Sequence, residues 1–346
     1  MKRLFLVTLF LALAVSGLDF HGGATVFAED PSAKWPKQII LGSFVKGSEQ
    51  YPTMVAAAQL ISKYTPAKAF VREYAGGTPI WEALMRGDID TWSIGYDEFH
   101  NAYYGKGFWK DKPQDIVLLT GAWIIGTTGF GVRPGEGISA LKDLAGKRCM
   151  VQSFIHGQNS AIEAAMKQAG VWDKAKILKM TSTSDLAPLM IDKKIDTFFW
   201  SADAGYTLQI KEAVGLEWIP LTKEEQHAAV TACPGMIPWK HPHPEMHGYP
   251  RDEIIPLVGY CMGIVSRTDM PDHVAYGILK AWYDENHLDE VRALSPSMET
   301  TTFENACKYF WNPFHPGAVQ FYKDKGIWTP ELEQRQKELL SAPRAK

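Results

Sequence analysis

The fold is restricted most by the regular alternation of apolar, strand-like runs with amphipathic, helix-like runs. Residues 39–45 have the pattern of a strand, and residues 51–64 repeat apolar side chains at helical spacing. Thr78 then caps a second helix that Gly87 closes, and residues 89–94 form the next strand. This alternation predicts an α/β fold in which parallel sheets are covered by helices.

One short motif occurs twice in the same structural context. The stretch GDIDTW at 87–92 places Ile-Asp-Thr and an aromatic residue directly after a helix, and KKIDTFFW at 193–200 does the same 106 positions later. The second copy is preceded by a predicted strand at 149–152, a helix at 159–169, and another helix capped by Ser184. Two similar α/β lobes are the economical explanation of this internal echo.

Two long apolar stretches, Ile116–Val132 and Leu257–Arg267, bracket the second copy. We interpret them as the two crossings between lobes. Lobe one then comprises residues 29–133 and 257–346, including late helices that begin near Pro271 and Pro330, and lobe two comprises residues 134–256. Open sheets bind ligands beyond the carboxyl ends of their strands, so the prediction is a ligand cleft between lobes that close by a hinge.

The amino-terminal residues have the composition of an export signal. Lys2 and Arg3 precede an apolar run over residues 4–15, and small residues lead to an expected cut near Ala28. The run is shorter than the roughly 20 residues that cross a bilayer. The first cysteine is Cys149, which argues against a lipid anchor. The predicted location is the periplasm.

Composition excludes several classes of protein. A formal net charge of −3 argues against nucleic acid as a partner, and 46% apolar residues are enough for a large core. The four cysteines form no CxxC pair, so no zinc or redox site is indicated. Four buried thiols and a single disulfide both remain open, and no cofactor is expected.

The motifs of common enzymes are absent from the sequence. We find no G-x-S-x-G, no H-E-x-x-H and no P-loop, so we expect a binding protein and not an enzyme. The stretch at 237–250 contains His241, His243 and His247 and could bind a metal. Its prolines indicate a loop, in which histidines are usually solvated, and the two readings stay open.

Candidate ligand contacts lie at strand ends and at one helix start. The HGQNS stretch at 156–160 stands before a helix, where backbone amides favour an anion. Among the aromatic residues, Trp92 lies inside a strand and is better explained as core, whereas Tyr96 and Trp200 lie at strand ends. These aromatics, with Trp123, suggest a ligand with an apolar or aromatic surface.

The order of motifs resembles the TAXI family, the extracytoplasmic solute receptors of tripartite, ion-driven TRAP transporters. The segment FHPGAVQFYKDKGIW at 314–328 looks like the family's terminal motif, and DLAGKR at 143–148, KKIDTFFW and SRTDMPD at 266–272 follow in family order. The resemblance implies a type II periplasmic-binding-protein fold that traps organic acids for two membrane subunits. We expect the receptor to be a monomer.

The resemblance also implies where a ligand binds: the loop 42–51, the turn 76–80, the strand end 95–97, the loop 157–160 and the segment after Trp200. The ligand-binding residues predicted from it and from the sequence are Ser43, Phe44, Ser48, Tyr51, Gly77, Thr78, Tyr96, Asp97, Trp123, His156, Gly157, Asn159, Ser160, Trp200, Ser201 and Asp203.

The sequence departs from the family at several of these places. Phe44 and Val45 stand where glycine and serine are usual, and Gly95 and Tyr96 replace a common glutamine and serine. Gly77 and Ile80 likewise stand where the family often has serine and asparagine. A glutamate-like ligand would leave polar groups unpaired in such a lining. The hypothesis is therefore a less polar, aromatic carboxylate, its anionic end held by Ser48, Asn159, Ser160 and backbone amides.

Two questions stay open at this level. The first is which arginine, among Arg72, Arg86 and Arg133, reaches the ligand; Arg133 is the leading candidate because it ends a crossing strand. The second is function: a periplasmic enzyme on the same two-lobed fold and a sensor that signals to a membrane kinase are the alternatives to a transport receptor.

Overall fold

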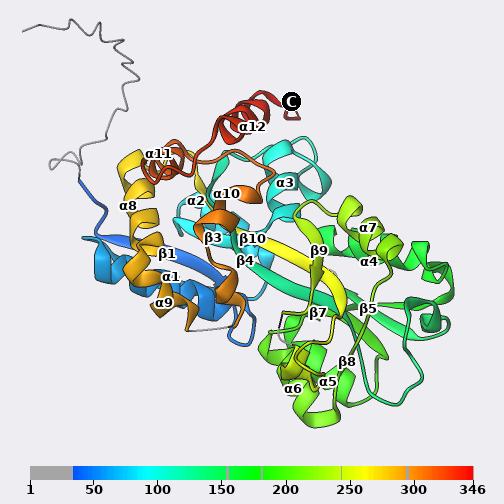
Figure 1. The fold of residues 1–346 in the computed structure, drawn as a ribbon. Helices are drawn as coiled ribbons and strands as arrows, with labels where there is room; N and C mark the ends of the chain where they lie inside the picture. The colour runs from blue at the N-terminus through cyan, green and yellow to red at the C-terminus, as the bar shows by residue number, and fades with distance from the viewer. Residues whose placement is uncertain (1–33, 153–155, 181, 243, 294–295, 346) are drawn as a thin grey trace, which may run out of the picture.

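A computed structural model describes residues 34–152, 156–180, 182–242, 244–293 and 296–345 (Figure 1). The predicted export signal and its cut near Ala28 lie outside these residues. Within them, ten strands form one sheet in the order β2-β1-β3-β10-β4-β7-β5-β6, with β8 beside β4 and β9 beside β10.

The strands are β1 Gln38–Phe44, β2 Lys68–Tyr74, β3 Thr91–Gly95, β4 Ile116–Val132, β5 Arg148–Gln152, β6 Lys176–Met180, β7 Thr197–Ser201, β8 Glu217–Ile219, β9 Met236–Lys240 and β10 Pro256–Arg267. The helices are α1 Gln50–Tyr64, α2 Gly77–Arg86, α3 Tyr96–Tyr104, α4 His156–Gln168, α5 Leu186–Ile191, α6 Gly205–Val214, α7 Lys223–Ala232, α8 Asp272–Tyr283, α9 Glu285–Arg292, α10 Phe303–Lys308, α11 Pro316–Asp324 and α12 Pro330–Ser341.

The sheet has a similar parallel unit at each end, and two long strands join the two units. Strands β2, β1 and β3 are parallel to one another at one end, and β6, β5 and β7 are parallel at the other. Between them, β10 runs antiparallel to β3, β4 runs antiparallel to β7, and β4 and β10 pair with each other. The predicted α/β fold with two lobes is confirmed, with one difference: the two lobe sheets are continuous through β4 and β10. The lobe boundaries at 133/134 and 256/257 remain a prediction.

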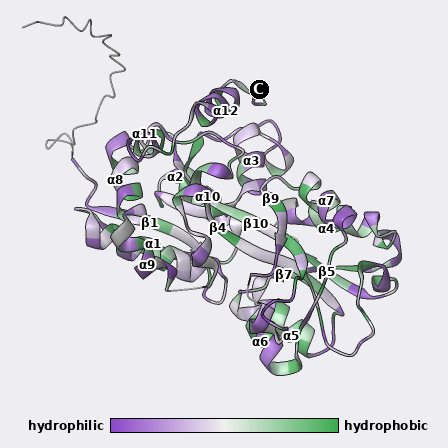
Figure 2. Ribbon diagram, viewed as in Figure 1, coloured by the Kyte–Doolittle hydropathy of each residue, from purple (hydrophilic) through white to green (hydrophobic). Residues whose placement is uncertain are grey.

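Helices cover both faces of this sheet (Figure 1), and the apolar core lies between the sheet and these helices. Strands β4 and β10 are buried along nearly their whole length, as their continuous apolar sequences predict. Figure 2 shows green and white residues along the sheet, while the covering helices carry purple residues on their outer turns. A smaller apolar cluster around Phe198, Leu186 and Trp218 fills the lower part of lobe two.

The repeated Ile-Asp-Thr motif makes equivalent hydrogen bonds in the two lobes, and we call each set of bonds a junction. In lobe one, Asp90 Oδ2 accepts the Ile40 amide at 2.7 Å, and in lobe two Asp196 Oδ2 accepts the Arg148 amide at 2.7 Å. Thr91 donates its hydroxyl to the Val265 carbonyl of β10. Thr197 donates in the same way to Gly131 of β4. The motif therefore ties a parallel strand pair to the crossing strand beside it.

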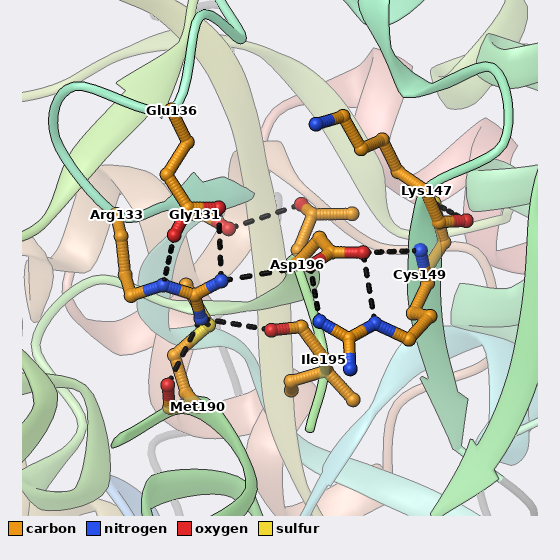
Figure 3. Close-up of polar contacts among 10 residues, drawn as sticks. Gly131, Arg133, Glu136, Lys147, Cys149, Met190, Ile195 and Asp196 are labelled. Carbon is orange, nitrogen blue, oxygen red and sulfur yellow. Dashed lines mark hydrogen bonds and ion pairs between the residues drawn. The ribbon is translucent and has the colours of Figure 1, made fainter. Parts of the chain in front are cut away.

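An arginine completes each junction. Arg267, at the end of β10, donates through Nη1 to the carbonyls of Leu84 and Ile89, both at 2.9 Å. Arg133, just after β4, donates through Nη1 to the carbonyls of Met190 and Ile195 at 2.9 and 2.8 Å (Figure 3). The accepting carbonyls are again 106 positions apart, so the sequence echo corresponds to a structural repeat.

The same correspondence extends to the turn before each motif. Gly87 follows α2 with a φ of 79°, in the left-handed region that favours glycine. The equivalent position of lobe two is Lys193, with a φ of 56°. A residue with a β-carbon therefore occupies a conformation that lobe one assigns to glycine.

Some local predictions need correction. Thr78 lies inside α2, whose N-cap is Gly76, and Ser182 rather than Ser184 caps the turn that precedes α5. The four cysteines are free and buried, so the single-disulfide alternative is not realised in this structure. Among the described helices, none is both long and apolar enough to cross a bilayer.

Candidate ligand-binding site

A cavity of about 290 Å³ lies at the carboxyl ends of β1, β3 and β7 and against both crossing strands. Residues from both lobes form its wall. The lining residues are Phe44, Ser48, Glu49, Gln50, Gly77, Thr78, Trp81, Trp92, Gly95, Glu98, Phe108, Trp109, Gly126, Thr128, Gln158, Trp200, Ser201, Tyr260 and Met262. The volume is close to the lower end of small-molecule sites, roughly 300 to 1,000 Å³.

An aromatic wall covers the lobe-one side of the cavity. Trp92 stands at its centre, with its ring centroid 6.2 Å from that of Phe44 and 5.1 Å from that of Trp81, both edge to face. Trp81 in turn contacts Trp109 at 5.6 Å. The Trp92 indole N–H donates to Gln50 Oε1 at 3.2 Å, which fixes the ring orientation. We refer to Phe44, Trp81, Trp92 and Trp109 as the aromatic wall.

Glu49 places a carboxylate in the cavity wall, where its side chain is only 7% exposed. It accepts a hydrogen bond from the Ser201 hydroxyl at 2.5 Å, across the gap between α1 and the end of β7. A β-carbon on Gly126 would lie 2.9 Å from Glu49 Oε2, so the glycine leaves room for the carboxylate. Tyr206 adds a second contact between lobes by donating its hydroxyl to the Lys46 carbonyl at 3.0 Å.

A second acidic side chain, Asp97, contacts the lining residue Tyr260. The Tyr260 hydroxyl lies over Gly95, where any β-carbon would collide with it, and donates to Asp97. The pKa of Asp97 is raised to about 7, chiefly by burial and also by the neighbouring Glu98, although the hydrogen bond from Tyr260 opposes both. Burial also raises the pKa of Tyr260 well above its usual range. Glu98, half-buried, lines the cavity itself.

The structure brings six of the predicted ligand-binding residues together in the lining: Phe44, Ser48, Gly77, Thr78, Trp200 and Ser201. Ser43, Tyr51 and Asp203 are not among the lining residues. Asp97 stands behind Tyr260. The six lining residues come from three of the predicted segments, the loop 42–51, the turn 76–80 and the segment at Trp200, which supports the prediction that a ligand binds in the cleft between the lobes.

Tyr96 and Trp123 lie elsewhere than expected. Tyr96 is fully buried, donates its hydroxyl to the Tyr309 carbonyl at 3.0 Å, and packs its ring 4.8 Å from that of Trp311. Trp123 is fully buried beside Trp282, at 5.2 Å. Both rings pack against the carboxyl-terminal segments of lobe one, so position at a strand end did not predict the direction of the side chain.

The predicted anion site at the start of α4 is only partly described. Gln158 lines the cavity, whereas Asn159 is bonded through its side chain to both backbone groups of Gln152. Ser160 is exposed. The side chain of His156 and the surroundings of Gly157 lie outside what the structure describes. Asn159 therefore joins the end of β5 to the first turn of α4, which leaves its side-chain amide fewer donors for a ligand.

None of the three candidate arginines is among the lining residues. Arg133 is 5% exposed and is bonded to Glu136 at 2.6 Å and to two backbone carbonyls, beside Asp196 at 3.6 Å (Figure 3). Arg72 donates to the Asp88 carbonyl, and Arg86 pairs with Asp88 on the surface. The leading candidate, Arg133, is thus a structural residue of the lobe-two junction.

The metal alternative gains no support from the part of the chain that the structure describes, in which no three His, Cys, Asp or Glu side chains form a group that could hold an ion. His241 is buried. His243 and the side chain of His247 lie outside the description. The stretch from 237 to 250 contributes no residue to the cavity lining.

Sequence reasoning missed the lining residues outside the predicted segments: Trp81, Glu98, Phe108, Trp109, Gly126, Thr128, Tyr260 and Met262. Glu49 and Gln50 lie inside the predicted loop 42–51 but were not named individually. Trp92 is buried, as expected of a core residue, and also lines the cavity. Trp81 follows Pro79 in the first turn of α2, and Glu98 follows Gly95 in the first turn of α3. A signal existed for both, because helix starts at the carboxyl ends of strands face the cleft of such folds. Phe108 and Trp109 lie in a short 3-10 helix, Gly107–Trp109, and no pattern in the sequence indicates their position.

Comparison with known proteins gives both a family and a fold. Residues 42–326 match the NMT1-like family. A ligand-binding component of an ABC-type import system from Staphylococcus aureus, solved with zinc bound, has a TM-score of 0.50 at 12% identity, over 88% of this chain and 99% of that one. The periplasmic aliphatic sulphonate binding protein of Escherichia coli has a TM-score of 0.49 at 14% identity, over 87% and 92%. The likeness to the Staphylococcus aureus protein supports the two-lobed fold.

Proposed function

Because the chain belongs to the NMT1-like family, we propose that it is an exported solute receptor: it captures a small molecule between its lobes and delivers it to a membrane transporter. The observation that carries the proposal is the cavity itself. Its wall comes from both lobes, and the Ser201 to Glu49 hydrogen bond joins them across it. Such a site encloses a ligand only when the lobes are together, which is what capture and release require.

The transporter of this proposal is of the TRAP type, with two membrane subunits, and the receptor is a monomer in the periplasm. The order of motifs that ends in residues 314–328 supports the TRAP assignment. The transporter types differ in their energy source. Uptake into vesicles carrying the membrane subunits is expected to need an ion gradient and no ATP, and uptake that needs ATP would instead assign the receptor to an ABC system.

The resemblance makes the ligand an organic acid with an apolar or aromatic body. The aromatic wall supports the apolar body of that ligand. The acidic group has weaker support, since the described lining contains no lysine or arginine. No catalysis is part of the proposal: the ligand leaves the cavity chemically unchanged.

The test is to purify the protein from the cells that export it, denature it, and identify released small molecules by mass spectrometry. One molecule per protein chain is expected, and its return to the emptied protein should reduce the radius of gyration measured by small-angle X-ray scattering. Chemical conversion of the returned molecule would instead favour a periplasmic enzyme. Tight binding with no change in radius would remove the closure mechanism.

A further inference from the structure

Phe108 differs from the other large apolar side chains of the cavity in its exposure. It is 60% exposed, and it is the one large hydrophobic residue of the described lining that is mostly open to solvent. Trp81, Trp92 and Trp200, which line the same cavity, are 2%, 1% and 8% exposed. The Phe108 ring therefore lies where the cavity opens to solvent. A ligand that covers this ring removes apolar surface from water, which favours binding.

A tight turn holds the Phe108 ring in position. The residue lies in the 3-10 helix Gly107–Trp109, where the Trp109 amide donates to the Lys106 carbonyl at 2.9 Å. Gly107 has a φ of 55°, in the left-handed region that favours glycine. The Phe108 ring centroid lies 5.2 Å from that of Trp109, edge to face, and Trp109 contacts Trp81 at 5.6 Å. A continuous row of rings thus leads from the mouth of the cavity to the buried part of the aromatic wall.

Three neutral polar residues of the lining, by contrast, are buried. Ser48 is 5% exposed, Thr128 is 2% exposed and Gln158 is 5% exposed. Thr78, at the start of α2, is exposed and is the exception to this trend. The lining is thus polar where it is buried and apolar at Phe108, where it is open.

The buried polar side chains keep some of their hydrogen-bonding capacity. The Ser48 hydroxyl accepts the Tyr51 amide at 3.3 Å, which leaves its own proton for another acceptor. Gln158 Oε1 accepts a hydrogen bond from Gln152 at 3.3 Å, which leaves the two amide hydrogens of Gln158. A polar group of a ligand is stable inside a protein only where such partners meet it.

Building on the solute-receptor function, we propose that the ligand lies with its polar end at the buried side chains and its apolar end against Phe108. Phe108 is then the residue that selects the ligand by its apolar end. A molecule with polar groups at both ends would place one of them against an apolar ring, where it loses water and gains no hydrogen bond. The ligand is therefore polar at one end only, and dicarboxylates are disfavoured.

The experiment uses two series of unbranched probes with four, six and eight carbons, because the head group must be tested both charged and neutral. The probes are butanoate, hexanoate and octanoate and the corresponding 1-alkanols, titrated calorimetrically into the full mature chain emptied of ligand. In the series that binds, two added methylene groups should strengthen binding by roughly 15-fold. Hexanedioate, which has the length of hexanoate but two acidic ends, should bind at least about 10-fold more weakly than hexanoate.

Phe108→Ser should weaken binding of the eight-carbon probe roughly 10-fold and of the four-carbon probe less than about 2-fold. This dependence on chain length separates a contact with the apolar end from a general disturbance of the cavity, which would weaken all three lengths alike. Phe108→Leu keeps an apolar side chain and should restore most of the affinity for the eight-carbon probe.

The control is Phe70→Ser, which removes a ring of similar exposure, 52%, from the edge strand β2, outside the cavity lining. It should leave every affinity unchanged. Equal weakening at all three lengths, undiminished octanoate and 1-octanol binding in Phe108→Ser, hexanedioate as tight as hexanoate, or no binding by either series at millimolar concentration each overturns the proposal. Circular dichroism verifies folding, and Phe108→Leu and hexanedioate remain informative if Phe108→Ser does not fold.

Failure of this placement is distinguishable from failure of the receptor function. If the molecule released from the native protein closes the lobes on its return and binds Phe108→Ser as tightly as the parent protein, the receptor function stands and the placement falls. If the returned molecule is converted chemically, the receptor function falls wherever its apolar end lies.

Discussion

At the scale of single residues, Asp97 is a buried carboxyl with a strongly shifted pKa. Its pKa is raised to about 7 because burial disfavours the carboxylate and Glu98 lies next to it. A carboxyl whose pKa is higher in the folded state than in the unfolded state binds its proton more tightly when folded. Its contribution to stability is therefore complete below pH 4 and is lost as the pH rises through 7.

We predict that the melting temperature of the protein falls between pH 5 and pH 8 and that Asp97→Asn reduces this fall. The asparagine keeps an acceptor for the Tyr260 hydroxyl but has no proton to lose. The measurement is thermal unfolding by circular dichroism at both pH values, with Asp192→Asn on the surface as the control. A fall of the same size in Asp97→Asn and the parent protein would contradict the prediction.

Lys193 provides a prediction from backbone geometry. It is exposed and has a φ of 56°, where the equivalent residue of lobe one is Gly87. A β-carbon in the left-handed region costs roughly 1 to 2 kcal/mol, and glycine offsets part of that gain through its larger entropy when unfolded. Lys193→Gly should therefore stabilise the protein by about 0.5 to 1 kcal/mol in urea unfolding. Lys194→Gly, one position later, should destabilise it, and the same sign for both variants would refute the argument.

The sequence predicted the kind of residue at the cavity better than the direction of each side chain. Phe44 and Trp200 were expected there and line the cavity, because they lie at the carboxyl ends of β1 and β7. Tyr96 comes directly after β3, yet its ring packs against Trp311 and not in the cavity. The partners of Tyr96, Tyr309 and Trp311, come next to it only in the folded protein. Contacts of this kind, between residues more than 150 positions apart, leave no local signal.

At the scale of elements, the crossing strands were the most predictable part of the chain. The strand β4 spans Ile116–Val132, as its apolar run predicts, and β10 spans Pro256–Arg267, one residue longer than expected. By contrast, β2 and β6 were not predicted. They are half-exposed strands at the two edges of the sheet, and charged residues such as Arg72 and Lys179 interrupt their apolar pattern.

The two equivalent junctions, one at Arg133 and one at Arg267, lead to a prediction because their arginines differ in burial. Arg133 is 5% exposed and interacts with Glu136 and Asp196, whereas Arg267 is 22% exposed and pairs with Asp269 near the surface. Removing one partner of a buried ion pair leaves an uncompensated charge and costs roughly 3 to 5 kcal/mol. Arg133→Met should therefore reduce the free energy of unfolding by about that amount.

Arg267→Met is the matched comparison, because it removes the same two carbonyl contacts from a more exposed site. We expect a smaller loss for it in the same urea titration. Equal losses would mean that the carbonyl contacts, which both junctions share, determine the cost, and that the extra charges around Arg133 contribute nothing measurable.

At the scale of the whole molecule, two hydrogen bonds described for the structure join the lobes near the cavity: Ser201 to Glu49 and Tyr206 to the Lys46 carbonyl. The second lies outside the lining, so it can be removed without altering the ligand contacts. Tyr206→Phe keeps the ring and deletes one hydrogen bond, worth roughly 0.5 to 1.5 kcal/mol. We predict a larger radius of gyration for the empty variant than for the empty parent protein in small-angle scattering.

A bound ligand should largely cancel that difference, since it adds contacts of its own between the lobes. Tyr249→Phe, a substitution within lobe two that removes a hydrogen bond to the Trp218 amide, is the control and should leave the radius unchanged. An unchanged radius in empty Tyr206→Phe would show that this hydrogen bond does not help to hold the lobes together.

The uninterrupted sheet has a mechanical consequence. Strands β4 and β10 are hydrogen-bonded to each other from Val258 to Arg267, so neither can slide past the other without breaking several bonds at once. Twisting costs far less, because hydrogen-bonded strands tolerate a wide range of twist. The connection between the lobes is therefore stiff against sliding and compliant in torsion, so we expect any motion of one lobe against the other to be a twist about these two strands.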